Sequence, residues 1–203
     1  MGNAMVLSEE QKTGLYTDIY DDSMWLINLV ENLLSITRID NGSLNLNFQA
    51  ELLEEVITEA LMHVNRNSVE HTIQTMQEDE LLMAKMDSRL IVQVLINLVD
   101  NAIKYTQAGS KIIVSARREQ QWVRIEVSDN GPGISEEAKS KLFDMFYTAD
   151  NKRGDSRRGL GLGLSLCKSI VHAHGGTVEV KDNVPQGTVF SFTLQAEEVN
   201  VHE

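Results

Sequence analysis

Residues 97–105 read N-L-V-D-N-A-I-K-Y, and we expect the rest of the chain to be organised around the helix that this stretch predicts. Asn97 and Asn101 are four residues apart, so a helix places them one turn apart on one face. Amide oxygens suit Mg²⁺, which is usually shared with substrate phosphates, and the ammonium group of Lys104 suits a phosphate. Taken alone, the pattern more often reflects local hydrogen bonding. Apolar residues surround it at helical spacing: Leu90, Ile91, Val94, Leu95, Leu98, Val99 and Ala102.

Size and composition narrow the possible classes of protein. The 203 residues are 42% hydrophobic and 24% charged, enough for one sizeable domain with an appendage. The net charge of −12 argues against nucleic acid or an anionic membrane surface as the main partner. A single cysteine, Cys167, excludes a disulfide framework and fits a reducing compartment. No apolar run is long enough for a membrane span, and the start lacks a signal peptide, so we expect a cytoplasmic location.

The first part of the chain predicts one long helix over residues 8–40, ended by Asn41-Gly42. Its apolar residues recur at alternating steps of four and three, which is typical of a coiled coil or helical bundle. A lone helix cannot bury such a surface, so we expect a partner helix from another copy or from sequence outside this chain. The repeating residues are Leu15, Ile19, Leu26, Leu29, Leu33 and Ile36.

From residue 43 onward, strands and amphipathic helices are mixed. Asp87 is expected to cap the central helix. The pattern predicts an α/β fold, a two-layer sandwich with helices on one face of a mixed, mostly antiparallel sheet, preceded by the long helix. Strands are expected at 43–49, 71–76, 82–85, 111–118, 122–128, 177–181 and 188–194, and further helices at 51–64, from Ser135, and at 160–173.

The stretch D-N-G-P-G-I, residues 129–134, directly follows an expected strand. Gly131 and Gly133 allow backbone to approach a ligand closely. A carboxylate at the strand end, from Asp129, can accept a hydrogen bond from an exocyclic amine such as adenine N6. The same residues also form an ordinary β-turn, which is the simpler interpretation of this stretch in isolation.

A second glycine-rich stretch, G-L-G-L-G-L at residues 159–164, opens a helix. Bare N–H groups at a helix N-terminus can bind phosphate. The stretch is neither a G-x-G-x-x-G that follows a strand nor a P-loop. Gly187-Thr188 interrupts the last strand pair and could lie near a base or only form a turn. The irregular loop before residue 159 carries Lys152, Arg153, Arg157 and Arg158, which could reach a polyphosphate or simply be solvated.

In this order, N-L-V-D-N-A-I-K-Y, D-N-G-P-G-I, L-F-D-M-F-Y, G-L-G-L-G-L and Q-G-T-V-F resemble the nucleotide-binding domain of two-component sensor histidine kinases. The resemblance implies the Bergerat ATP-binding fold, shared with gyrase and MutL-type ATPases. It divides the chain into a helix at 1–42, an ATP-binding domain at 43–195 and a tail at 196–203. R-I-D-N-G and H-A-H-G-G resemble the Kdp-type potassium or turgor sensors within this family.

The family resemblance implies ATP and Mg²⁺ as cofactors. Asn101 would bind Mg²⁺ with Asn97 beside it, Lys104 would touch a phosphate, Tyr105 would pack near adenine, and Asp129 would bind adenine N6. Hydrolytic relatives carry a glutamate where this chain has Asn97, and an asparagine cannot act as a general base, so slow hydrolysis is expected. The remaining site residues implied are Gly131, Gly133 and Ile134 around the pocket, Arg158, Gly159, Leu160, Gly161, Leu162, Gly163 and Leu164 on the phosphate side, and Thr188 near the base.

The phosphoacceptor histidine of this family is not found here. It lies in an S-H-E-[LF]-x-x-P-like sequence, and none of His63, His71, His172, His174 and His202 has that context. The long helix therefore resembles only the second helix of the dimerisation hairpin. The resemblance implies that the chain binds ATP without autophosphorylation and forms a homodimer through the long helix. In the parent, anchored in the bacterial membrane, the phosphoryl group would pass to a histidine and then to a response regulator.

Three alternatives stay open at this point. An anti-sigma-factor-type serine kinase shares the pocket, but the long helix argues against it. A hydrolytic ATPase of the gyrase class is opposed by Asn97. A scaffold without nucleotide, which only pairs helices, is opposed by the intact glycine motifs.

Overall fold

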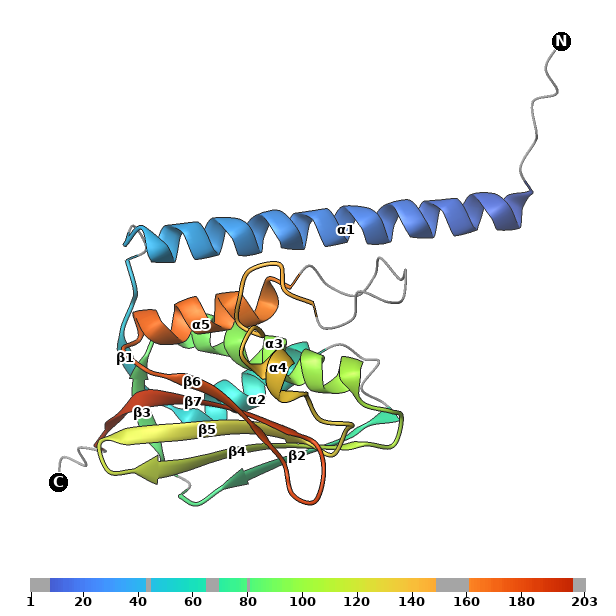
Figure 1. Ribbon diagram of the computed structural model, residues 1–203. Coiled ribbons are helices and arrows are strands. Elements are labelled where there is room, and N and C mark those ends of the chain that lie inside the picture. The colour runs from blue at the N-terminus through green and yellow to red at the C-terminus, as the bar shows by residue number, and fades with distance from the viewer. Residues whose placement is uncertain (1–7, 43–44, 65–69, 80, 149–160, 199–203) are drawn as a thin grey trace, which may run out of the picture.

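The computed structural model describes residues 8–42, 45–64, 70–79, 81–148 and 161–198. Helix α1, Glu9–Asp40, begins at a capping box between Ser8 and Gln11, which satisfies free N–H groups of its first turn. Figure 1 shows α1 lying over α5, Gly163–Ala173, and extending well beyond it. Near its C-terminal end Ile36 is only 2% exposed and belongs to the main core, which joins this end of α1 to the rest of the fold.

The remaining described elements form a mixed sheet covered on one face by helices (Figure 1). The strand order is β1-β3-β7-β5-β4-β2, with β6 also pairing with β7. The β2–β4 pair is parallel and the other pairs are antiparallel. The strands are β1 Gln49–Leu52, β2 Thr72–Gln77, β3 Met83–Met86, β4 Lys111–Glu119, β5 Trp122–Asp129, β6 Val178–Asp182 and β7 Thr188–Glu197; the helices are α2 Leu53–His63, α3 Ser88–Tyr105, the short α4 Glu136–Lys139, and α5.

The core lies between the sheet and helices α2, α3 and α5. Along β5, and along β4 as far as Ala116, every second residue is buried, as expected for a sheet with one face against a core. Helix α3 contributes seven buried apolar residues to the same layer. Helix α3 packs on β4, β5 and α5, and Asn97 on this helix lies beside the start of α5.

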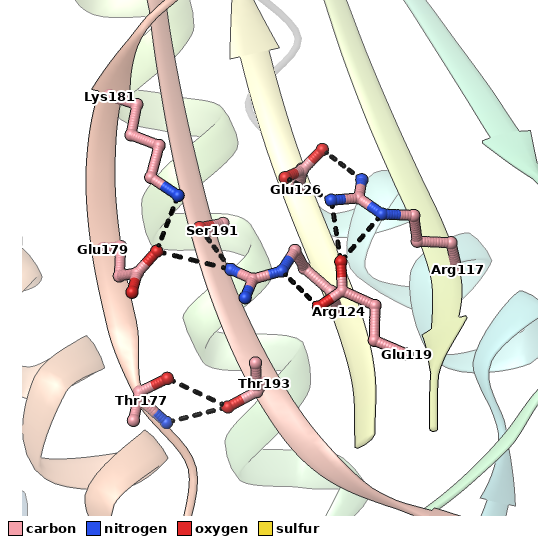
Figure 2. A network of polar contacts seen from close by, with 9 residues as sticks. All are labelled: Arg117, Glu119, Arg124, Glu126, Thr177, Glu179, Lys181, Ser191 and Thr193. Carbon is pink, nitrogen blue, oxygen red and sulfur yellow. Dashed lines mark hydrogen bonds and ion pairs between the residues drawn. The ribbon is translucent and has the colours of Figure 1, made fainter. Parts of the chain in front are cut away.

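The opposite face of the sheet carries a network of ion pairs across β4, β5 and β6 (Figure 2). The Arg124 guanidinium donates to Glu119 at 2.8 Å and to Glu179 at 3.4 Å. The Arg117 guanidinium donates to Glu126 at 2.7 Å. Opposite charges on neighbouring strands favour this register, because a slip by one residue would move them to the core face.

Most expected elements are confirmed to within one to three residues, and the expected strand at 43–49 is wrong. The strand β1 begins at Gln49, because Gln49–Leu52 pairs antiparallel with β3, while 45–48 has no regular structure. Helix α2 accordingly begins at Leu53 rather than residue 51. The position of Asp87 as N-cap of α3 is confirmed, but its side chain makes no capping hydrogen bond.

The two-layer α/β architecture with a preceding long helix is confirmed. Among the described helices, none combines the length and the apolar character that crossing a bilayer requires. The alternation of Leu44, Leu46 and Phe48 suggested a strand for a segment that instead leads from α1 into the sheet.

Candidate functional site

Asp129 ends β5, and its carboxylate is held from two sides. The side chain is almost buried, at 7% exposure. Its Oδ1 accepts hydrogen bonds from the backbone N–H of Gly131 at 2.8 Å and from that of Thr188 at 3.2 Å. Burial raises the pKa of Asp129 above its usual range, and the two backbone hydrogen bonds oppose this effect. No hydrogen bond from the described residues reaches the second oxygen, Oδ2.

Close contacts around Asp129 explain why residues 131 and 187 are glycines. Gly187 has φ +124°, and a Cβ there would overlap the carbonyl oxygen of Asp129. A Cβ on Gly131 would lie 2.6 Å from Cγ2 of Thr106, at the end of α3. The carbonyl of Asp129 also accepts a hydrogen bond of 2.8 Å from Nδ2 of Asn183. The ends of α3 and β5 and the start of β7 therefore meet at this residue.

The next part of the turn continues against the same hairpin. Gly133 has φ +79°, and a Cβ there would lie 3.4 Å from the carbonyl oxygen of Gly187. Ile134 is half-buried and packs against the hydrophobic core. The D-N-G-P-G-I stretch is thus a turn, as the simpler interpretation held, and its residues also pack beside Asp129.

Asn97 projects from α3 toward the beginning of α5. Asn97 is half-buried, and its Nδ2 is buried without a hydrogen-bond partner among the described residues. A Cβ on Gly163 would lie 3.6 Å from Oδ1 of Asn97, so α5 begins directly beside this amide. Asn101 is also half-buried, one turn further along. The Asn97 side chain nevertheless lies close enough to the thiol of Cys167 on α5 to lower the pKa of that thiol, so the amide faces the contact between α3 and α5.

Cys167 lies beneath this amide on α5. The thiol is fully buried, and burial raises the pKa of Cys167 to about 12. Its Sγ lies 3.8 Å from the carbonyl oxygen of Val94 on α3. A thiol that stays protonated is a poor nucleophile, and Cys167 is part of the hydrophobic core.

The last turn of α3 carries Lys104 and Tyr105 at the surface. Tyr105 is 51% exposed, and Nζ of Lys104 lies 5.2 Å from the centre of its ring. This is within cation–π distance. Both side chains lie on the turn that precedes Thr106, which is the residue in contact with Gly131.

The described part of the G-L-G-L-G-L stretch, residues 161–164, forms a tight turn into α5. Gly161 has φ +68°, its carbonyl accepts from the N–H of Phe146 at 3.1 Å, and a Cβ would overlap the carbonyl oxygen of Tyr147. Leu162 is buried and Leu164 packs against the core, so the leucines anchor the turn while the glycines form it. The predicted site residues Arg158, Gly159 and Leu160 lie outside the described residues.

Two contributors to this arrangement were not expected from the sequence. Thr106 reaches Gly131, and its Oγ1 lies 3.0 Å from Nε2 of His71. Asn183 holds the carbonyl of Asp129 from the β6–β7 turn. Neither belongs to a recognisable motif, since each acts through a contact between segments far apart in the chain.

Comparison with known proteins agrees with this geometry. The family model "Histidine kinase-, DNA gyrase B-, and HSP90-like ATPase" matches residues 86–198, more than half of the chain. The chain belongs to this family. Sensor protein KdpD of Clostridium acetobutylicum is 42% identical over 195 residues, which are 96% of this chain and 22% of that protein. The chain therefore spans about a fifth of the length of this curated relative.

Solved histidine kinase structures share the fold. The catalytic domain of histidine kinase ThkA superposes with a TM-score of 0.66 and 34% identity, over 73% of this chain and 95% of that chain. ThkA in complex with the response regulator protein TrrA superposes with a TM-score of 0.75 and 28% identity, over 96% of this chain and 54% of that one.

These findings confirm the resemblance to sensor histidine kinases and the assignment of the ATP-binding fold of this ATPase family. The serine-kinase and hydrolytic-ATPase alternatives receive no support, because the relatives named here are sensor kinases. The nucleotide-free scaffold is also disfavoured by membership of an ATPase family.

Proposed function

We propose that this histidine kinase catalytic domain binds ATP with Mg²⁺ through the residues that meet at Asp129 and Asn97. In the parent protein it would transfer the γ-phosphoryl group to a histidine of a separate helix, from which an aspartate of a response regulator receives it. The observation that carries the proposal is the buried carboxylate of Asp129, with one oxygen held by two backbone N–H groups. A kinase of the Kdp type is the parent that we favour, given the 42% identity to a KdpD protein.

Adenine recognition follows from the hydrogen-bonding capacity of Asp129. An ionised carboxylate only accepts hydrogen bonds, so Oδ2 suits the exocyclic amine at N6 of adenine. Guanine presents a carbonyl at the same place, which also only accepts, so it is disfavoured. Gly131, Gly133, Ile134 and Thr188 would shape the pocket for the base, and the ring of Tyr105 would pack near it.

The phosphate end would be formed by α3 and the start of α5. Asn101 and Asn97 supply neutral amide oxygens for Mg²⁺, and Lys104 supplies a charge for a phosphate. Among the described residues no three His, Cys, Asp or Glu side chains gather where a metal ion could bind. This fits Mg²⁺, which retains waters and is shared with substrate phosphates instead of occupying an all-protein cage. The bound ion would neutralise charge on the phosphates during transfer.

The N-terminus of α5 would bind phosphate through backbone N–H groups. Gly163 lies beside Asn97 and Gly161 packs directly on the backbone of Phe146 and Tyr147, while Leu162 and Leu164 anchor the turn. Arg158, Gly159 and Leu160 complete the proposed phosphate side. Because Asn97 has no basic group to activate water, the γ-phosphoryl is kept for a protein nucleophile.

The long helix is proposed as the second half of a dimerisation and phosphotransfer hairpin, with a boundary near residue 42. The expected start of a tail at residue 196 is wrong, because Ala196 and Glu197 belong to β7 and pair with β3. Its apolar residues are largely exposed, including Leu15 at 45%, Ile19 at 59% and Leu26 at 50%. A surface of this kind pairs with another helix, which we propose to be a second copy together with the missing helix of the parent. The response regulator is proposed as partner by analogy with the ThkA–TrrA complex, and the cytoplasm as location.

Calorimetry with ADP and Mg²⁺ tests nucleotide binding directly. The wild-type chain should release heat, and Asn101→Ala and Asp129→Ala should each weaken binding. The transfer step is tested by mixing the chain with a helical-hairpin domain that carries a phosphoacceptor histidine and with labelled ATP. Acid-labile phosphate on the hairpin supports the proposal; phosphoserine, or no heat of binding, would overturn it.

A further inference from the structure

The segment that joins α1 to the ATP-binding domain is held by a single buried carboxylate. The backbone N–H of Asn47 donates a hydrogen bond of 3.1 Å to Oδ2 of Asp87, at the N-terminus of α3. Asp87 is 4% exposed, although its side chain caps no helix N–H. A buried carboxylate at an N-cap normally accepts from its own helix, so its use here for the joining segment calls for an explanation.

The imidazole of His174, at the C-cap of α5, holds Asp87 in turn. His174 is 6% exposed. Its Nδ1 lies 2.8 Å from the carbonyl oxygen of Ile170, and its Nε2 lies 3.0 Å from the backbone nitrogen of Asp87. A carbonyl can only accept, so Nδ1 carries the hydrogen. A backbone N–H can only donate, so Nε2 must be the acceptor, and only the neutral ring satisfies both contacts.

The aromatic ring of Phe48 completes the contact. It meets the His174 ring edge-on, with centroids 5.2 Å apart and an angle of 71° between the planes. Asn47 and Phe48 therefore both depend on His174, the first through Asp87 and the second directly. These two residues immediately precede β1, where the chain enters the sheet.

The charged surroundings allow a second arrangement. From α3 the ring faces the carboxylate of Asp87, which also lies 3.8 Å from the largely exposed Arg89. From α5 it faces the Ile170 carbonyl, and from the joining segment the uncharged Phe48. Burial lowers the pKa of His174, while the Ile170 carbonyl and Asp87 oppose this effect. A protonated ring would direct Nε2–H at the Asp87 N–H, two donors facing each other, while the negative charge of the Asp87 carboxylate favours the charged ring.

We propose that His174 is a positioning residue whose neutral imidazole, acting through Asp87, fastens the Asn47–Phe48 segment and so sets how α1 is held against the ATP-binding domain. Protonation of the ring turns it toward the Asp87 carboxylate, which then releases the N–H of Asn47. The arrangement acts as a latch between the nucleotide-binding domain and the helix that leads to the phosphoacceptor. Its consequence for phosphoryl transfer rests on the proposed function, whereas the latch itself does not.

Nuclear magnetic resonance of the 203-residue chain tests the latch. Long-range ¹H–¹⁵N spectra should show His174 with hydrogen on Nδ1 at neutral pH. Exchange protection of the Asn47 amide, corrected for the intrinsic effect of pH, should decrease as His174 becomes protonated below its ordinary pKa of 6.5. The amides of β5, Trp122–Asp129, should remain protected over the same range and exclude global unfolding.

Two variants separate the hydrogen bond from simple packing. His174→Phe keeps a ring against Phe48 but cannot accept from Asp87, so protection of the Asn47 amide should fall about tenfold at neutral pH. His174→Gln keeps an acceptor and cannot be protonated, so it should restore protection and remove the pH dependence. Asp87→Ala, which removes the acceptor itself, should reproduce the loss.

Three results would overturn the latch: hydrogen on Nε2 at neutral pH, unchanged Asn47 protection in His174→Phe, or pH-dependent release that persists in His174→Gln. Binding of ADP and Mg²⁺, measured on the same samples, should be unaffected by the His174 variants. If the wild-type chain does not bind ADP and Mg²⁺, that result would contradict the proposed function but would not contradict the latch.

Discussion

The carboxylate oxygen Oδ1 of Asp129 accepts a hydrogen bond of 3.2 Å from the backbone N–H of Thr188, a residue 59 positions later in the chain. The contact exists because β5 and β7 pair antiparallel, with Ser128 opposite Val189. The pairing brings the end of one strand to the start of the other. The position of the proposed adenine ligand is therefore a property of the sheet as much as of its own turn.

Replacing Asp129 by Asn should separate binding from stability. The amide oxygen can still accept from Gly131 and Thr188, but the NH₂ group that replaces Oδ2 cannot accept from adenine. Affinity for ADP should fall roughly 10- to 100-fold, as expected for loss of a hydrogen bond to a charged group. Calorimetry measures the loss, and Asp129→Ala, which removes both functions, is the comparison.

The same variant tests the pKa of Asp129 in the absence of nucleotide. Because burial raises this pKa, the folded state holds the proton to higher pH than the unfolded state, and stability decreases as pH rises through that range. At neutral pH, Asp129→Asn should thus be at least as stable as wild type, and the advantage should vanish below the ordinary pKa of 3.8. A clearly less stable apo variant would contradict this account.

Gly187→Ala should destabilise the fold through a specific overlap. Its φ of +124° is unfavourable for alanine, and the new Cβ would overlap the carbonyl oxygen of Asp129. We expect a loss of more than about 2 kcal/mol in the free energy of unfolding, measured by urea titration. Gly175→Ala is the matched control, since Gly175 also has positive φ, at +74°, but nothing lies within 4 Å of its Cβ position. If the two variants lose the same free energy of unfolding, the overlap at residue 187 does not contribute and the prediction is contradicted.

Cys167 should react with thiol reagents only when the protein unfolds. The thiol is buried, and its pKa is raised to about 12, so little thiolate exists at neutral pH. Labelling in water should be slow and should accelerate along the urea unfolding transition followed by circular dichroism. Rapid labelling of the native protein would mean that α3 and α5 separate locally at the site of Asn97.

The ion pairs around Arg124 should make stability depend on pH in the acid range. The Arg124 hydrogen bond lowers the pKa of Glu119, and Lys181 lowers that of Glu179. The resulting stability is present above the ordinary pKa of 4.5 and is lost as pH falls through the lowered values. Arg124→Gln should therefore be less stable at neutral pH, by about 1 kcal/mol or less at this partly exposed site. The difference from wild type should shrink toward pH 3 and in high salt, as measured by thermal unfolding.

Self-association through α1 should be sensitive to charge on its repeating apolar face. Leu26→Glu and Ile19→Glu place charges among exposed apolar side chains and should shift the chain toward monomer in sedimentation experiments. Thr17→Glu adds the same charge on the opposite side of the repeat and should leave association unchanged. A wild-type chain that is monomeric at high concentration would remove the proposed homodimer through this helix.

The helices and strands whose sequence pattern is local were predicted correctly. The 3.6-residue period of α3 and the alternation along β4 and β5 each report burial of one face, and the structure has these elements where they were expected. The prediction of a strand before Gln49 was wrong because three alternating apolar residues suit a strand whether or not a neighbouring strand is available to pair with it. Register with β3 decided the matter, since Gln49 pairs with Met86.

The sequence by itself determined the family, the helix that carries Asn97 and Asn101, and the positions of the glycine-rich turns, because each depends on residue types within a short window. Only the tertiary structure decided that Thr188 holds Asp129, that Gly163 lies beside Asn97, and that His174 reaches the N-terminus of α3. These are contacts between segments 59, 66 and 87 residues apart (163 − 97 = 66). Such contacts arise from the packing of α3 and α5 on the sheet, and no periodicity within either partner specifies them.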